Sequence, residues 1–171
     1  MKINNLIDGK AISVAIKEEL ILDAEKFYQD TNIHPKLSVL ILGEDPASIF
    51  YVRMIEKSCQ KVGFQFEKYS LSGQTNENEL LELIEKLNND QKIHGIIVQT
   101  PLPVQINQSN IQRALSPDKD VDCFNPINMG KLAMGNPGFL PCTPNAVFEI
   151  LQRENIEVEG KHVVIVGRSS I

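Results

Sequence analysis

The chain has 171 residues and a mass of 19.2 kDa, with 42% hydrophobic and 23% charged residues. This length suits one domain, or one domain with part of a second, because a folding unit typically contains about 100–150 residues. The formal net charge of −5 argues against a nucleic-acid or anionic-membrane surface, which needs clustered Lys and Arg. No apolar run approaches the roughly 20 residues that span a bilayer, and the start lacks a signal-peptide core, so we expect a cytoplasmic protein.

The cysteines and histidines are too scattered for a disulfide framework or a metal site. Cys59, Cys123 and Cys142 are odd in number and form no CxxC pair. The three histidines form neither an HExxH motif nor an i,i+4 pair. We therefore expect reduced thiols and no protein-bound metal.

The first half of the chain predicts alternating helices and strands. Apolar residues at four-residue spacing indicate an amphipathic helix over about Lys10–Gln29. A short apolar run predicts a strand at Lys36–Leu42, covered on both faces. Asp45 supplies an N-cap, followed by proline at the first helical position, and Gly63 supplies a stop, which together predict a helix over Pro46–Val62.

The same alternation continues through the middle of the chain. Phe64–Tyr69 alternates as a second strand, and Thr75 or Asn76 caps a further helix. Ile93–Gln99 is a third apolar strand, and a short helix near Gln108–Leu115 follows it.

The last third is less regular. Ser116–Pro141 is rich in Asp, Asn, Gly and Pro and predicts a loop with one helical turn. Thr143 and Pro144 repeat the cap-and-proline pair and predict a helix to about Asn155. His162–Gly167 is rich in β-branched residues and predicts a fourth strand. The order of elements predicts an α/β fold of parallel strands with right-handed helical crossovers.

Candidate functional segments follow the predicted strands, because open parallel sheets bind ligands outside the carboxyl ends of their strands. This rule selects Gly43–Tyr51, Gln99–Pro103 and Gly167–Ile171, and the polar loop Asp118–Asn125 is a fourth candidate. The final segment lacks the GxGxxG fingerprint, yet its Gly, Arg and Ser offer N–H groups and a guanidinium to a phosphate.

Each candidate also has a purely structural interpretation. An aromatic residue such as Tyr51 is more often half-buried packing than a ligand platform. An amide at a strand end, like that of Gln99, often pairs only with the backbone of the next loop. Asp118, Asp120 and Asp122 can equally form a solvated turn.

Six motifs taken together change this balance because their order resembles one family from end to end. They are IDGK at Ile7–Lys10, SIFYV at Ser48–Val52, GIIVQTPLP at Gly95–Pro103, PDKDVDCFNPINMGKL at Pro117–Leu132, PCTP at Pro141–Pro144 and VGRSS at Val166–Ser170. The chain resembles the bifunctional methylenetetrahydrofolate dehydrogenase/methenyltetrahydrofolate cyclohydrolases. The resemblance implies oxidation of 5,10-methylenetetrahydrofolate with NADP, or with NAD, and hydrolysis of the product to 10-formyltetrahydrofolate.

The resemblance also implies a domain division and a set of site residues. Residues 1–140 would form a folate-binding catalytic domain of three-layer parallel βα units. Residues 141–171 would form the linking helix and first strand of a truncated Rossmann-type NAD(P)-binding domain, in a homodimer. The implied catalytic residues are Tyr51, which stacks on the folate rings, Gln99, which lies near the reacting centre, and Asp122, which binds the pterin amino edge. Further substrate contacts are implied for Val98, Pro101 and Leu102, and cofactor contacts for Gly167, Arg168 and Ser169.

One departure from the family pattern concerns the hydrolytic step. The family has a lysine one turn after the tyrosine, through which hydration of the methenyl carbon is catalysed, and this chain has Ile55 there. Lys57 lies about 240° from Tyr51 around the helix and faces away. Hydride transfer needs no such base, so we expect dehydrogenase chemistry with weak or absent cyclohydrolase activity. Cys123 and Asn125 replace a usual Gly and His and alter the loop beside Asp122.

Two other functions stay open on the sequence alone. The chain could be a non-catalytic folate-binding or interaction module that derives from such an enzyme. More remotely, it could be an unrelated Rossmann-type module, which predicts no folate binding.

Overall fold

A three-stranded parallel sheet organises the protein, whose computed structural model describes residues 6–167. The strands are β1 (Lys36–Leu42), β2 (Gln65–Leu71) and β3 (Gly95–Val98), in the order β2-β1-β3. Leu40 of the central strand pairs with Tyr69 on one side and Val98 on the other. The predicted α/β class and parallel strands are confirmed.

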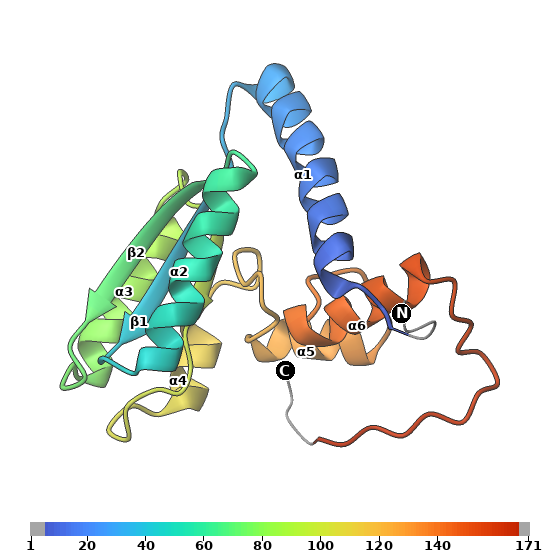
Figure 1. Cartoon of the computed structure of the whole chain (residues 1–171). Helices are drawn as coiled ribbons and strands as arrows, with labels where there is room; N and C mark the ends of the chain where they lie inside the picture. Colours follow the sequence, from blue (N-terminus) through green and yellow to red (C-terminus); the bar gives the residue numbers. More distant parts are fainter. Residues whose placement is uncertain (1–5, 168–171) are drawn as a thin grey trace.

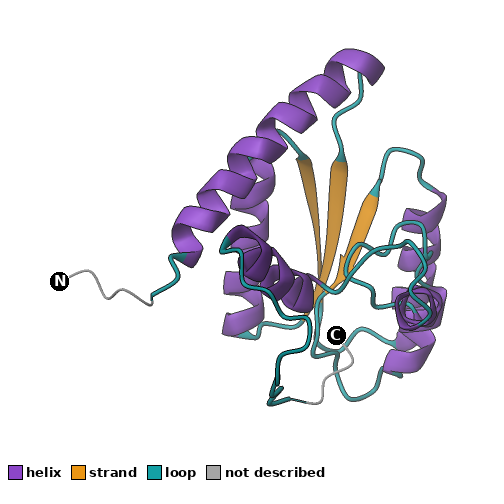
Figure 2. Cartoon of the chain, turned by 90° about the vertical axis from the view of Figure 1, so that its right-hand side faces the viewer, coloured by secondary structure: helices purple, strands orange, loops and turns teal. Residues whose placement is uncertain are grey.

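Helices cover both faces of this sheet and make three layers (Figures 1 and 2). Helix α2 (Pro46–Lys61) lies on one face, and α3 (Glu77–Asn89) and α4 (Gln108–Ala114) lie on the other. The larger hydrophobic cluster joins the α3 and α4 side of the sheet, and a smaller cluster around Val39, Ile41 and Val52 joins the α2 side. The central strand β1 is buried on both faces, as predicted for Lys36–Leu42.

Local capping explains where these helices begin and end. The Asp45 carboxylate accepts a hydrogen bond from the Ser48 amide at 2.8 Å, and Gly63 takes a positive φ of 78° just past α2. Asn76, one of the two predicted caps, forms a capping box with Glu79 at the start of α3.

Helix α1 (Gly9–Thr31) stands apart from the sheet and buries none of its residues. It lies against α6 (Cys142–Arg153), where the Arg153 guanidinium donates to both oxygens of Glu19 at 2.8 and 2.6 Å. The two helices, separated by more than a hundred residues in the sequence, therefore lie side by side through a bidentate ion pair.

The region predicted as a loop with one helical turn contains a longer helix, α5 (Pro126–Ala133). Asn125 caps it by accepting from the Ile127 amide at 2.7 Å, and proline follows at the first helical position. The predicted start of the next helix was also wrong. Helix α6 begins at Cys142, one residue before Thr143, and its N-cap, Pro141, makes no side-chain hydrogen bond.

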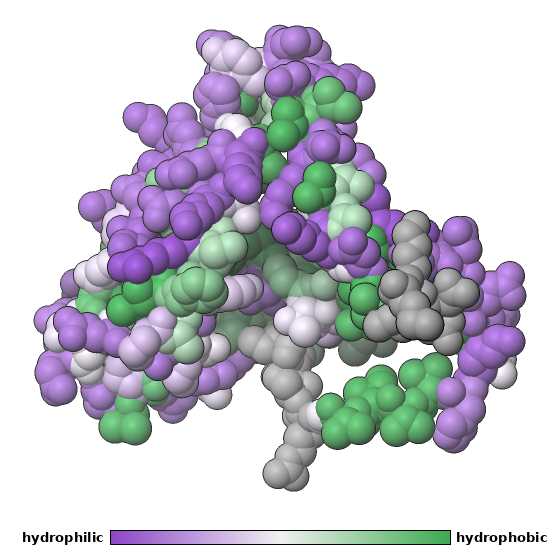
Figure 3. All heavy atoms as spheres, viewed as in Figure 1, coloured by the Kyte–Doolittle hydropathy of each residue, from purple (hydrophilic) through white to green (hydrophobic). Residues whose placement is uncertain are grey.

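The predicted fourth strand at His162–Gly167 is not formed. Val163, Val164, Ile165 and Val166 are 61–97% exposed, and their atoms stand apart from the rest of the molecule in Figure 3. A strand needs a neighbouring strand for its backbone hydrogen bonds, and no described segment lies beside this one. Arg168–Ile171 lie outside the described residues. Within residues 6–167, no helix is long and apolar enough to cross a bilayer.

Candidate functional site

A mostly apolar cleft of about 700 Å³ opens between three helices and the sheet. Its walls come from α1, α2 and α6, and Leu37 and Ile97 of the sheet contribute to its floor. Figure 3 shows apolar side chains in the hollow between α1 and the sheet. Largely apolar clefts with a few polar groups are the usual sites for small organic ligands, so this cleft is the first candidate site.

Helix α2 places Tyr51 and Ile55 one turn apart in this cleft. Tyr51 is 52% exposed, so part of its ring surface is open to a ligand. Burial, and then the charge of Asp122, raise the pKa of Tyr51, which keeps its hydroxyl neutral. Ile55 packs against the cluster around Val39, Ile41 and Val52.

Lys57, the other basic candidate on this helix, is exposed and does not line the cleft. The prediction that it faces away from Tyr51 is confirmed. The lining of the cleft therefore contains no basic side chain from α2.

Asp122 joins this site through the start of α6. Its Oδ1 accepts a hydrogen bond from the Cys142 amide at 3.3 Å. Cys142 is the first residue of α6, whose own N-cap, Pro141, offers no acceptor, so Asp122 supplies one from a distant loop.

The Cys142 thiol is held in its neutral form. Partial burial, a hydrogen bond to Asp122 and the negative charge there raise the pKa of Cys142 to about 12. A neutral thiol is a weak nucleophile. Cys142 therefore contributes shape and a weak hydrogen-bond donor to the cleft.

Asp120 builds the loop that carries Asp122. It is fully buried, and its carboxylate accepts from the Phe124 amide at 2.8 Å, the Asn125 amide at 2.8 Å and the Asn128 side chain at 2.9 Å. The alternative of a solvated aspartate turn therefore holds only for Asp118, the exposed member of the three.

Cys123 replaces a glycine of the family, and its backbone adopts a conformation that glycine favours. Its φ is 58°, in the left-handed region that side chains adopt at a cost. The hydrogen bonds of Asp120 to the next two backbone amides hold this conformation in place.

Gln99 lies at the carboxyl end of β3, where its backbone amide donates to the Leu40 carbonyl at 2.9 Å. Its side-chain amide donates to the Thr100 carbonyl at 2.9 Å, in the loop that contains the cis Thr100–Pro101 peptide. Strand alternation places the side chain on the face of Ile97, which is the α2 face. The connection after β1 leads to α2 on one face and the connection after β3 leads to α4 on the other, so the topological switch point of the sheet lies between the carboxyl ends of these two strands.

Within residues 6–167, Tyr51 is the only predicted site residue that itself lines the cleft. Val98 is buried in the larger cluster on the α3 side, and Leu102 packs against the same cluster. Pro101 is exposed. Gly167 lies in the exposed tail, and Arg168 and Ser169 lie outside the described residues.

Sequence analysis missed the contribution of α1 and of Cys142. Ile12, Ser13, Ile16 and Lys17 of α1 line the cleft. These residues share one face of the helix, which the helical period of the sequence predicted. The period does not indicate which other elements that face lies against.

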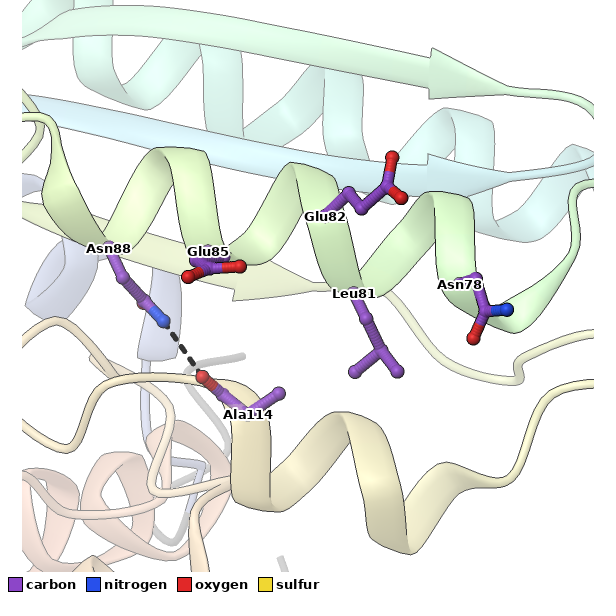
Figure 4. A pocket seen from close by; sticks show the side chains of 6 residues that line it. All are labelled: Asn78, Leu81, Glu82, Glu85, Asn88 and Ala114. Atoms are coloured by element: carbon purple, nitrogen blue, oxygen red, sulfur yellow. Dashed lines mark hydrogen bonds between the residues drawn. The ribbon is translucent and has the colours of Figure 1, made fainter.

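A second hollow, of about 410 Å³, lies between α3 and α4 (Figure 4). The Asn88 side chain bridges the two helices by donating to the Ala114 carbonyl at 2.7 Å. None of its lining residues belongs to the motifs near Tyr51 and Asp122. No cluster of three or more metal-ligating side chains occurs within residues 6–167.

Comparison with known proteins identifies the family of this chain. Residues 7–122 match the model of the tetrahydrofolate dehydrogenase/cyclohydrolase catalytic domain, and residues 141–171 match the NAD(P)-binding domain of the same name. The bifunctional FolD proteins of Acetivibrio thermocellus and Geotalea daltonii are 47% and 49% identical over 166 residues. These 166 residues are 97% of this chain but only 58% and 59% of those proteins, so the chain spans less than two thirds of their length.

Solved structures extend the similarity to three dimensions. The FolD enzyme of Campylobacter jejuni is 44% identical with a TM-score of 0.93, over 98% of this chain and 59% of that one. The Trypanosoma brucei enzyme, solved with NADP and an inhibitor, is 33% identical with a TM-score of 0.93, over 97% of this chain and 57% of that one.

Proposed function

This chain belongs to the tetrahydrofolate dehydrogenase/cyclohydrolase family, and on that premise we propose that it is the folate-binding part of a one-carbon enzyme. We assign residues 1–140 to a folate-binding catalytic domain and residues 141–171 to the start of an NAD(P)-binding domain. The whole enzyme would oxidise 5,10-methylenetetrahydrofolate with NADP, or with NAD, and would hydrolyse the product. The observation that carries the proposal is the contact of Asp122 with Cys142, which lines the same apolar cleft as Tyr51, together with the effect of the Asp122 charge on the pKa of Tyr51.

The chemistry of this cleft suits a folate. The exposed part of the Tyr51 ring offers a stacking surface to the aminobenzoate or pterin ring. Asp122 has a second carboxylate oxygen beyond the one that accepts from Cys142, and a carboxylate matches the paired N–H donors of a pterin amino edge. Gln99, at the switch point, would contact the substrate near its reacting carbon.

Residues 6–167 do not form a binding site for the nicotinamide cofactor. Gly167 is the one predicted cofactor contact that the structure describes, and apart from its chain neighbour no described residue lies within 4 Å of a Cβ added there. We therefore derive no step through the cofactor and assign hydride acceptance to the NAD(P)-binding domain of the family. What this part of the chain contributes is the binding and orientation of the folate.

The hydrolytic half of the chemistry lacks its basic residue. Ile55 takes the place of the family lysine in the wall of the cleft, and an alkyl group can neither accept a proton nor polarise water. We propose that cyclohydrolase activity is weak or absent in this chain. Folate binding, which depends on Tyr51 and Asp122, would persist.

A binding experiment tests the proposal. Titration calorimetry with tetrahydrofolate should show binding to the native chain, and Asp122→Asn should weaken it by roughly ten- to a hundredfold, because one charge-assisted hydrogen bond contributes about 1.5–3 kcal/mol. Asp118→Asn is the matched control, because it removes the same charge from an exposed position of the same loop. Absence of binding by the native chain, or equal losses in the two variants, would contradict the proposal.

We further propose a cytoplasmic homodimer whose ligand is a small molecule. Cys59, Cys123 and Cys142 are all free thiols, which suits a reducing compartment. The exposed apolar residues Val147 and Phe148 of α6 offer a surface for a second copy. Light scattering coupled to size exclusion should give twice the monomer mass, and a monomer at high concentration would contradict the dimer.

A further inference from the structure

A single lysine of α1 lines the same cleft as Tyr51. Lys17 is the only basic residue that lines it within residues 6–167, and Glu149 is the only acidic one. We propose that Lys17, together with Ser13, binds the glutamate carboxylates of the folate whose rings lie at Tyr51. The inference rests on the proposed function and adds to it a subsite for the anionic tail of the substrate.

The surroundings of Lys17 leave its ammonium free for an anion. Its Nζ donates to the Ser13 hydroxyl at 3.1 Å, and it forms no ion pair with another residue of the described part. Glu149, the acidic residue that lines the same cleft, accepts a hydrogen bond from Arg153 at 3.2 Å and not from Lys17. Arg153 is held in turn by Glu19. Lys17 is half-buried as a residue, and its ammonium, with one neutral partner, has N–H donors to spare.

The contacts of helix α6 show that Asp122 and Lys17 lie near opposite ends of this helix. The first residue of α6, Cys142, is bonded to Asp122. Its last residue, Arg153, is bonded to Glu19, two residues beyond Lys17 on α1. Cys142 and Glu149 both line the cleft, and a rise of 1.5 Å per residue separates them by about 10 Å along the helix.

This arrangement matches an elongated ligand with distinct ends. A hydrogen-bonding heterocycle would lie at Asp122, an aromatic ring would lie at Tyr51, and an anionic group would reach Lys17. A folate has this order of groups: pterin, aminobenzoate and glutamate. The Ser13 hydroxyl, one helical turn before Lys17, can donate a second hydrogen bond to the same carboxylate.

The test compares ligands that differ only in the tail. Titration calorimetry would measure tetrahydrofolate and tetrahydropteroate, which lacks the glutamate, against the native chain and Lys17→Met. Methionine keeps the length and helix preference of lysine without its charge. Lys26→Met is the matched control, because Lys26 lies on the same helix, is exposed and does not line the cleft. Thermal unfolding of each variant checks that the fold is retained.

We expect the native chain and Lys26→Met to bind tetrahydrofolate about tenfold more tightly than tetrahydropteroate, the effect of one charge-assisted hydrogen bond at a partly exposed site. Lys17→Met should bind the two ligands equally. Equal binding of both ligands by the native chain, or an undiminished preference in Lys17→Met, would overturn the inference while leaving the proposed function intact. Failure of the native chain to bind either ligand would overturn both.

Discussion

Replacing Ile55 by lysine should create hydrolytic activity towards 5,10-methenyltetrahydrofolate. Ile55 lies one turn from Tyr51 and lines the same cleft, so the stem of a lysine can keep the apolar contacts while its ammonium reaches the cavity. Partial burial in apolar surroundings would lower the pKa of this lysine towards neutrality, where it can exchange a proton with water.

The expected gain follows from the role of the missing group. A positioned general acid or base contributes about 10²–10⁴-fold to a rate, so Ile55→Lys should hydrolyse the substrate at least about a hundredfold faster than the native chain. The stability cost should be small. Full burial of an isoleucine side chain stabilises a protein by roughly 1.5–3 kcal/mol, and Ile55 is only partly buried, so its replacement should lower the free energy of unfolding by about 1 kcal/mol. That loss lowers the melting temperature by about 2–4 °C.

The assay follows the absorbance of the methenyl compound during hydrolysis and needs no nicotinamide. The native chain, Ile55→Lys and a sample without protein are compared under the same conditions. Ile55→Met is the control for changed packing, because it supplies a flexible side chain of similar size without an amine, and it should stay inactive.

Two results would refute this account of the site. If the native chain hydrolyses the substrate well above the uncatalysed rate, another group activates the water and the isoleucine is not the cause of a deficit. If Ile55→Lys binds tetrahydrofolate but remains inactive, the cleft does not hold the methenyl carbon within reach of position 55.

Two further predictions concern the loop and the thiol beside the site. Asp120→Ala removes the carboxylate that accepts three buried hydrogen bonds, so the free energy of unfolding should fall by about 3 kcal/mol or more and the melting temperature by roughly 10 °C. Asp118→Ala should leave the melting temperature nearly unchanged. Equal effects of the two substitutions in a thermal melt would contradict the structural role of Asp120. The pKa of Cys142 is raised to about 12, so iodoacetamide should alkylate it more slowly at pH 8 than free cysteine, and faster after Asp122→Asn lowers that pKa. Peptide mass spectrometry measures both rates, and a native rate equal to that of free cysteine would show that the thiol is not protected.

Much of the candidate site followed from local sequence signals. The helical period places positions 51 and 55 on one face, and the structure confirms that both line the cleft. The replacement of a family glycine at Cys123 marked a backbone position with a positive φ. Val98 was assigned to the ligand by resemblance, yet strand alternation turns its side chain into the core on the other face of the sheet.

The sequence by itself determined the βα units, the capped starts of α2 and α3, and the family, because caps, prolines and apolar periods act within a few residues. Only the tertiary structure decided which distant segments meet. It joined Asp122 to the first turn of α6, placed Lys17 of α1 in the same cleft as Tyr51, and left residues 162–167 without a strand. The physical reason is that such pairings depend on surfaces supplied by residues far away in the chain. A β-branched segment can form a strand only where another backbone offers its hydrogen bonds.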